Sequence, residues 1–262
     1  MPTTDHGAVM YARSKWAAAS GIPFFTGEGG INQNRWQKGI AKVSPAASMR
    51  GIRDQIWLSM MCGANGALMW TAGVDAEMAE FGKVSPALNA VGVDLLSLER
   101  RRPATVVVMP DDASANRTAY ALAYQLLSRG IDFDTRPATD STEYAVRLDP
   151  AKTEVPEDLT AEFFVPGNGW QAAALVSKSA DQAIVYLRNV AGGLEDRGGK
   201  KRPCWVRTPQ AVVPSVRLLN GRWGQIRAFD LDQATSVAIT RNGNVISGTA
   251  ATDHDLVLGF RR

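Results

Sequence analysis

One short stretch near the amino terminus limits the fold more than any other part of the chain. It reads Pro23-Phe24-Phe25-Thr26-Gly27-Glu28-Gly29-Gly30, in which strand-forming residues run into three glycines and one carboxylate. Bulky and β-branched side chains suit a buried strand, and glycines allow a sharp turn directly after it. Parallel α/β sheets and barrels carry their chemistry at the carboxyl ends of such strands. We therefore predict that Glu28 lies at the end of a buried strand and is the first candidate for a catalytic residue.

The first hundred residues alternate between helical and strand patterns. Helices are predicted over residues 10–20, from Ser48 onward and from Ser85-Pro86 to the arginine run that ends at residue 102. The apolar spacing of the second helix predicts one buried face, formed by Met49, Ile52, Ile56, Trp57 and Met60. A second buried strand over residues 67–70 ends at Trp70. The order helix, strand, helix, strand, helix predicts parallel βα units.

Three segments of this region, taken in order, resemble the final third of a clan A glycoside hydrolase barrel. They are residues 23–30, 49–57 and 63–70, and the resemblance covers about residues 8 to 100. Similar enzymes include the family 42 beta-galactosidases and family 5-like enzymes. The resemblance implies that Glu28 is the catalytic nucleophile at the end of the seventh barrel strand. It also implies that Trp70 closes the sugar subsite from the end of the eighth.

The chemistry of this clan explains why those residue types are needed. Retaining hydrolysis uses one carboxylate to attack the anomeric carbon and a second carboxyl, about 5–5.5 Å away, to protonate the leaving oxygen. A tryptophan face offers the sugar ring an apolar platform. The polar loop after Glu28 adds Gln33, Asn34 and Trp36 as candidates for contacting the glycan. The alternatives are a Glu28 carboxylate bonded to loop amides and a Trp70 side chain packed in the core.

The sequence also departs from the clan A pattern. The clan's general acid/base is a Glu that follows an Asn at the end of the fourth strand, but only 27 residues precede Glu28 and none is a Glu. A complete (β/α)₈ barrel takes about 250 residues. We therefore expect residues 1–102 to form only the carboxyl-terminal part of such a barrel, inactive by itself. The competing hypothesis is a non-catalytic carbohydrate-binding or scaffold protein derived from such an enzyme.

Residues 103–150 are predicted to form an abbreviated flavodoxin-like α/β module. A continuous apolar strand over residues 104–110 is followed by a helix that begins near Ala115 and by a strand over residues 131–134. The turn after the first strand has no glycine, and Asp111 and Asp112 would repel a phosphate. This module is therefore not expected to bind a nucleotide.

The remaining chain is predicted to be a linker, residues 151–169, and an antiparallel β-sandwich, residues 170–262. Short strand-like runs alternate with hairpin signals such as Asn242-Gly243. The order of these runs resembles the terminal sandwich of many clan A hydrolases, some of which bind carbohydrate through exposed aromatics. The candidates here are Trp170, Trp205 and Trp223, with packing inside the sandwich as the alternative reading.

Composition and charge exclude several classes of function. The 29 Lys and Arg are scattered among 26 Asp and Glu, whereas a nucleic-acid binder concentrates its basic residues on one face. No apolar run approaches the ~18 residues that would span a membrane. The two cysteines are far apart, and Asp230, Asp232, Asp253 and Asp255 lack the EF-hand spacing, so no metal and no cofactor are expected. The expected partners are a carbohydrate and either the amino-terminal barrel portion or a second copy.

Overall fold

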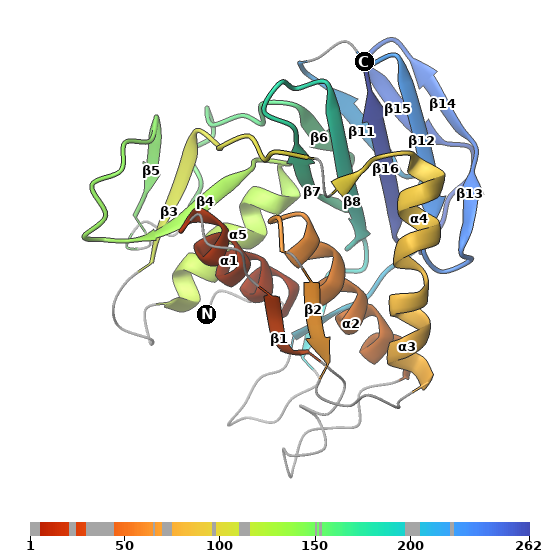
Figure 1. Ribbon diagram of the computed structural model, residues 1–262, viewed down its shortest axis with the longest axis horizontal. Coiled ribbons are helices and arrows are strands. Elements are labelled where there is room, and N and C mark those ends of the chain that lie inside the picture. The colour runs from red at the N-terminus through yellow and green to blue at the C-terminus, as the bar shows by residue number, and fades with distance from the viewer. Residues whose placement is uncertain are drawn as a thin grey trace.

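The computed structural model describes residues 6–20, 25–29, 45–64, 66–69, 75–95, 98–109, 116–149, 151, 154–196, 205–220 and 223–262. The fold is mixed α/β, with the helices and parallel strands in the amino-terminal part of the chain and the antiparallel sheets in the carboxyl-terminal part (Figure 1). The antiparallel sheets agree with the predicted sandwich.

The amino-terminal region alternates helices with short strands. Its elements are α1 (His6–Ala19), β1 (Phe25–Gly29), α2 (Pro45–Met60), β2 (Gly66–Met69), α3 (Asp75–Gly82) and α4 (Val84–Val91). Strands β1 and β2 pair in parallel, as the predicted βα order requires. They form a sheet of two strands, so membership of this region in a barrel stays a prediction.

Helix α2 is buried more completely than its sequence predicts. The apolar spacing predicts one buried face, yet every residue from Ile52 to Ser59 is buried. The polar face carries Arg53 and Asp54, and both charges are paired inside the protein. This pairing offsets the large cost of removing a charge from water. The helix begins at Pro45 rather than Ser48, because proline is well suited to the first helical position.

Helix α4 is shorter than predicted and lies directly against the sandwich. It ends at Val91 because Gly92 adopts φ 69°, a left-handed conformation that stops the helix, and donates its N–H to the Leu88 carbonyl. The helix therefore ends well before the arginine run. A Cβ at Gly259 in the sandwich would lie 2.4 Å from the carbonyl oxygen of Val91. The helix end and the strand thus meet backbone to backbone.

A second parallel sheet follows the helices. The predicted βαβ unit consists of β3 (Thr105–Met109), α5 (Asn116–Ser128) and β4 (Phe133–Pro137). A further strand, β5 (Val146–Leu148), pairs on the other side of β3. The sequence does not predict β5, because a strand of three residues has too few positions to display an alternating pattern.

The carboxyl-terminal sandwich is built from short strands. They are β6 (Phe164–Pro166), β7 (Trp170–Val176), β8 (Gln182–Asn189), β11 (Ser215–Leu218), β12 (Gln225–Asp230), β13 (Thr235–Val237), β14 (Ile239–Asn242), β15 (Val245–Gly248) and β16 (Leu256–Arg261). The two sheets have the orders β14-β15-β11-β6 and β13-β12-β16-β8-β7, and β9 (Leu194–Asp196) pairs separately with β10 (Trp205–Arg207). Strand β6 lies in the predicted linker, but it pairs with β11 and so belongs to the sandwich.

Aromatic side chains fill the space between the two sheets. The Phe164 and Phe260 ring centroids lie 4.7 Å apart, and Trp223 lies 5.8 Å from Phe164. Trp170 is also buried and donates its indole N–H to a backbone carbonyl. Trp170 and Trp223 therefore pack as core residues and do not offer an exposed platform for a sugar. The side chain of Trp205 lies outside the described part.

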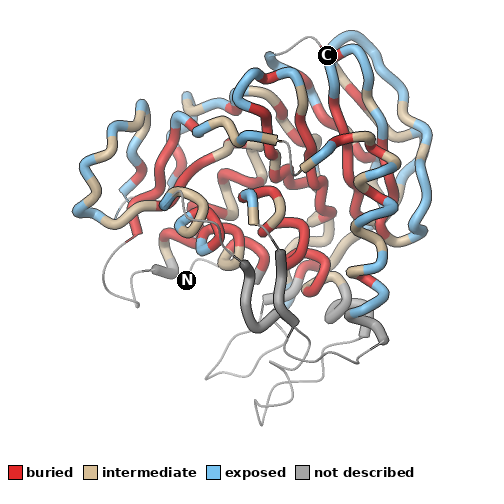
Figure 2. The backbone as a smooth tube through the Cα atoms, in the orientation of Figure 1, coloured by how far each residue is buried: buried red, intermediate tan, exposed pale blue. Residues whose placement is uncertain are grey.

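One buried cluster joins the helices, the parallel sheet and the sandwich. It includes residues of α1, α2, α5, β3, β7 and β8. Trp57 of α2 stacks on Tyr186 of β8, with ring centroids 6.1 Å apart. Figure 2 shows the buried residues along the central helices and inner strands and the exposed ones along the outer edge of the sandwich. In the described part of the chain, no helix has the length and apolar character needed to cross a membrane.

Candidate functional site

Strands β1 and β2 end at the same edge of their parallel sheet. Thr26 pairs with Ala67 and Gly29 pairs with Met69. Between these two pairs, β1 advances by three residues and β2 by only two. The extra residue makes a bulge, and Glu28 lies in it. Bulges bend a strand and re-aim side chains, and they are common next to active sites. The strand continues through Gly29 because its pairing with β2 resumes there, so the backbone of Glu28 lies near the carboxyl end of the strand.

The other predicted site residues lie outside the described part of the chain. They are Gln33, Asn34, Trp36 and Trp70, and for Glu28 the structure describes the backbone but not the side chain. Trp70 directly follows Met69, the last residue of β2. Because β1 and β2 are parallel, the strand that leads to Trp70 ends beside the Glu28 bulge. The roles of all five residues stay predictions.

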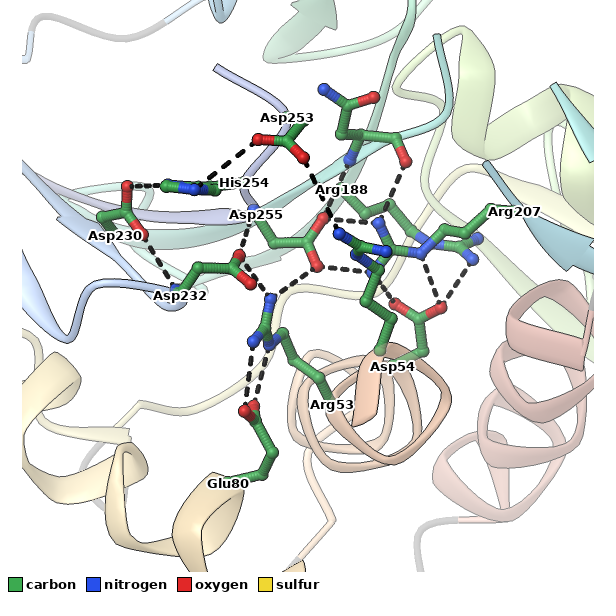
Figure 3. A network of polar contacts seen from close by, with 12 residues as sticks. Arg53, Asp54, Glu80, Arg188, Arg207, Asp230, Asp232, Asp253, His254 and Asp255 are labelled. Carbon is green, nitrogen blue, oxygen red and sulfur yellow. Dashed lines mark hydrogen bonds and ion pairs between the residues drawn. The ribbon is translucent and has the colours of Figure 1, made fainter. Parts of the chain in front are cut away.

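The largest polar feature of the described residues is a network of ion pairs between α2 and the sandwich (Figure 3). Its members come from six parts of the fold and are Arg53, Asp54, Glu80, Arg188, Arg207, Asp230, Asp232, Asp253, His254 and Asp255. We refer to this set as the ion-pair network. The sequence does not predict this network.

Arg53 pairs with three carboxylates at one end of the ion-pair network. It extends from α2 between Glu80 of α3 and two carboxylates of the sandwich (Figure 3). Its Nε lies 2.8 Å from Glu80 Oε2, and its Nη1 lies 2.6 Å from Asp232 Oδ2 and 3.1 Å from Asp255 Oδ2. Burial alone would lower the pKa of Arg53, but its hydrogen bonds with Glu80 and the surrounding carboxylates raise it. The guanidinium therefore stays charged.

Arg207 pairs with two carboxylates at the other end of the ion-pair network. This fully enclosed guanidinium lies between Asp54 of α2 and Asp255, with Nη1 2.6 Å from Asp255 Oδ1 and Nε 3.1 Å from Asp54 Oδ2. Arg188 of β8 donates a further bond of 2.7 Å to Asp54 Oδ2. Tyr186 donates its hydroxyl to Asp54 Oδ1 at 2.7 Å. Each carboxylate is thus bonded to several donors, as buried charges require.

The protonation states of Asp255 and of its neighbour Tyr186 argue against a proton-transfer role for these two groups. Burial alone would raise the pKa of Asp255, but the charge and hydrogen bonds of Arg207, with the charge of Arg53, hold it well below its usual range. Burial and the nearby carboxylates raise the pKa of Tyr186. Asp255 therefore stays ionised and Tyr186 stays neutral near pH 7, so neither group exchanges a proton in the range where a general acid or base works. These two groups therefore stabilise the structure and do not transfer protons.

One corner of the ion-pair network has a spacing that would suit a metal ion. Atoms of Asp230, Asp232 and His254 lie within 4.8 Å of one another, the one such group among the residues that the structure describes. These atoms already have partners. Asp230 accepts two backbone N–H groups and contacts the His254 ring, while Asp232 Oδ2 accepts from Arg53. A cation would have to displace these bonds, so we assign the group to ion pairing rather than to a metal centre.

A hollow of about 930 Å³ lies between α2, α4 and the sandwich. Its apolar lining includes Ile56, Met60, Phe81 and Leu88. Gly63 and Ala64, which also line it, precede β2, so the hollow lies at the opposite end of that strand from the Glu28 bulge. It is therefore separate from the candidate site.

The ion-pair network leaves a weak signal in the sequence. Arg53 and Asp54 interrupt an apolar helical pattern, and Arg188 and Asp255 stand at the ends of apolar strands. Charged residues in such positions are rarely buried unless they are paired. The pattern thus signals that partners exist, but it does not show which residues they are.

Comparison with known proteins gives only distant likenesses, all among solved structures. No family model matches the chain, and no curated protein matches it. Among solved structures, a glycoside hydrolase, alpha-L-fucosidase isoenzyme 2 from Paenibacillus thiaminolyticus, matches with a TM-score of 0.48 and 9% identity. The match covers 100% of this chain and 64% of that one, so the chain spans less than two thirds of the length of this neighbour. A likeness at this level assigns neither a family nor an activity.

Proposed function

We propose that this chain is the carboxyl-terminal portion of a retaining glycoside hydrolase and that Glu28 is its catalytic nucleophile. The observation that carries the proposal is the bulge in β1, which includes Glu28 at the edge where two parallel strands end. Parallel α/β folds bear their catalytic groups at that edge, and a bulge there re-aims a side chain. The resemblance of residues 8 to 100 to a clan A barrel supports the same assignment.

In the proposed reaction, the Glu28 carboxylate attacks the anomeric carbon while a general acid protonates the leaving oxygen. Water then hydrolyses the glycosyl ester and restores the carboxylate. Trp70, directly after β2, would supply the apolar platform for the sugar ring. Gln33, Asn34 and Trp36 belong to the segment that begins where β1 ends, and they would contact the glycan.

The general acid would come from barrel strands other than β1 and β2. Asp5 is the only carboxylate that precedes Glu28 in the sequence, whereas the clan A acid is a Glu. We therefore expect no turnover from the 262-residue chain alone. Because the resemblance is to the family 42 enzymes, aryl β-galactosides are the first substrates to test.

The ion-pair network has a supporting role in this proposal. Helix α2 packs against β1, and Arg53 and Asp54 tie the same helix to the sandwich. Catalytic groups need a rigid support to hold their geometry. The sandwich would thus help to hold the strand that carries Glu28.

The test uses this chain joined to the amino-terminal barrel portion that the proposal requires. We expect Glu28→Gln to lower turnover of aryl β-galactosides by about a thousandfold or more, because the covalent step loses its nucleophile. Glu99→Gln, at an exposed glutamate, is the matched control and should keep wild-type turnover. Retained turnover in Glu28→Gln would remove Glu28 from this role.

A second measurement separates a nucleophile from a general base. In Glu28→Gly, added azide should restore product formation and give a glycosyl azide of inverted anomeric configuration, since azide replaces the missing carboxylate on its own face of the sugar. An azide product of retained configuration would identify Glu28 as the acid/base instead. If the native gene encodes no barrel sequence upstream, the non-catalytic scaffold hypothesis replaces this proposal.

A further inference from the structure

His254 lies in a group of charged residues beside helix α2 (Figure 3). It belongs to the segment that leads into β16. Its ring faces carboxylates from the end of β12 and from its own segment, and these carboxylates pair in turn with charged groups of α2 and α3. The full set is Asp230, Asp232, Asp253, Asp255, Arg50, Arg53, Glu80 and Lys83. The imidazole is 25% exposed and so can exchange a proton with solvent.

Both ring nitrogens of His254 face carboxylates. Nδ1 lies 2.7 Å from Asp230 Oδ2, and Nε2 lies 3.6 Å from Asp253 Oδ1. A neutral imidazole has one N–H and one lone pair, so one carboxylate would face a lone pair. The imidazolium has two N–H groups and is attracted to both sides. The geometry therefore fits the protonated ring.

The two carboxylates connect His254 to helix α2 by separate routes. Asp230 Oδ1 accepts the N–H of Asp232 at 2.8 Å and so holds the turn in which Asp232 pairs with Arg53 at 2.6 Å. Asp253 lies 3.8 Å from Arg50. A change of charge at the imidazole therefore alters the electrostatic interactions in both connections between the sandwich and the helix.

Negative charge exceeds positive charge around the imidazole. Asp230, Asp232 and Asp253 face Arg50 and Arg53, but Arg53 is already shared with Glu80 and Asp255, and Glu80 has one further cation, Lys83. A proton on His254 supplies the missing positive charge. Burial alone would lower the pKa of His254, but the hydrogen bond with Asp230 and the charges of Asp230, Asp232 and Asp253 raise it above the usual histidine value.

We propose that a proton on His254 fastens helix α2 to the sandwich, and that its loss loosens this interface, so that this corner of the ion-pair network is a pH-sensitive latch. The latch does not depend on the catalytic role of Glu28. Because folding raises the pKa of His254, its stabilisation is complete below the unfolded value, about 6.5. It is lost as the pH rises through the higher folded value. Each unit by which the folded pKa exceeds the unfolded pKa corresponds to about a tenfold change in the folding equilibrium constant.

The first test is an NMR titration of the imidazole C–H signals. The chain has two histidines, His6 and His254, so His6→Gln leaves one signal and assigns it. We expect His254 to titrate at a higher pH in the folded chain than in urea, and Asp253→Asn to lower that pH. A folded pKa at or below the unfolded one, or no shift in Asp253→Asn, overturns the proposal.

The second test compares unfolding midpoints between pH 6 and pH 9. The unfolding midpoints of wild type and His6→Gln should fall as the pH rises across this range. At pH 6, His254→Gln should have a lower midpoint than wild type, and its midpoint should fall less between pH 6 and pH 9. An identical pH profile in His254→Gln and wild type overturns the latch. If His254→Gln does not fold, the pH profile of Asp253→Asn is the test. Its loss of stability should begin at a lower pH than that of wild type, because the pKa of His254 is then lower.

Hydrogen exchange locates the effect. After correction for the intrinsic effect of pH, amides of α2 should exchange faster at pH 9 than at pH 6, while those of α5, remote from His254 in the sequence and outside the network, should not change. This difference should vanish in His254→Gln. Equal acceleration in α2 and α5 would show general destabilisation and would overturn a latch at this interface.

Discussion

Arg207 illustrates how single residues hold this protein together. Its side chain is 2% exposed, and its guanidinium lies between Asp54 and Asp255, which are themselves buried. A guanidinium suits this position because it offers several donors in a fixed plane and stays charged. Such a pair contributes little net stability compared with apolar packing, but removing one partner leaves an uncompensated buried charge. The residues of the network are therefore interdependent.

Asp54→Asn tests this interdependence. The change leaves Arg188 and Arg207 without the carboxylate that both contact, so we expect the free energy of unfolding to fall by about 3–5 kcal/mol. Urea denaturation measures it. The control is Glu99→Gln, whose partner Lys178 is 72% exposed, and for which the loss should be within about 1 kcal/mol. Similar losses in both variants would contradict the structural role assigned to Asp54.

Among the elements, helix α4 depends on a close backbone contact with the sandwich. It is eight residues long, too short to be stable alone, so packing on the sandwich must stabilise it. The contact is possible because Gly259 of β16 has no side chain where the Val91 carbonyl approaches. Helix α2 gains its stability differently, through a core face and a paired polar face.

Two glycine substitutions should have opposite effects. Gly259→Ala would bring a Cβ to 2.4 Å from the Val91 oxygen, so the helix must shift and we expect a loss of about 1–3 kcal/mol or more. Gly51→Ala in α2 meets nothing within 4 Å and should stabilise the chain by about 0.5–1 kcal/mol, because alanine is the better helix former. Thermal unfolding of both variants measures this, and a stable Gly259→Ala would contradict the close approach.

In the whole molecule, the helices, the parallel sheet and the sandwich share one core. Buried residues of the sandwich belong to the same cluster as residues of α1, α2 and α5. Ion pairs add to this contact on two sides, since Lys15 of α1 pairs with Asp132 beside β4 and Arg53 of α2 pairs with the sandwich. The regions on either side of the boundaries predicted at residues 102 and 169 therefore share buried contacts, and the boundaries themselves stay predictions.

Separating the sandwich from the helices should expose this interior. A chain of residues 154–262 alone would uncover the core residues Ile184, Tyr186, Phe229 and Val257. We expect it to bind a hydrophobic dye and to self-associate, whereas the full chain unfolds in one cooperative transition. A monomeric, dye-free sandwich with the full chain's unfolding midpoint would show that the helices contribute nothing to its core.

The local patterns of the chain were enough to predict most of its elements. The glycine-flanked stretch around Glu28, the apolar spacing of residues 49–60 and the hairpin signal at Asn242-Gly243 indicated a strand, a helix and a turn, because each depends on neighbours within a few positions. They also predicted the order of parallel strands and antiparallel sheets. The spacing of apolar residues records which side of an element is buried, but not what covers it.

The partners across the interior depended on the packing of distant segments. Arg207 meets Asp54 from 153 positions away, and Gly259 accommodates the end of a helix that the sequence extended to the arginine run. The bulge at Glu28 likewise depends on its register with β2, which is specified by pairing between strands rather than by either strand alone. Charges and close backbone contacts act through space, so their positions followed only from the assembled fold.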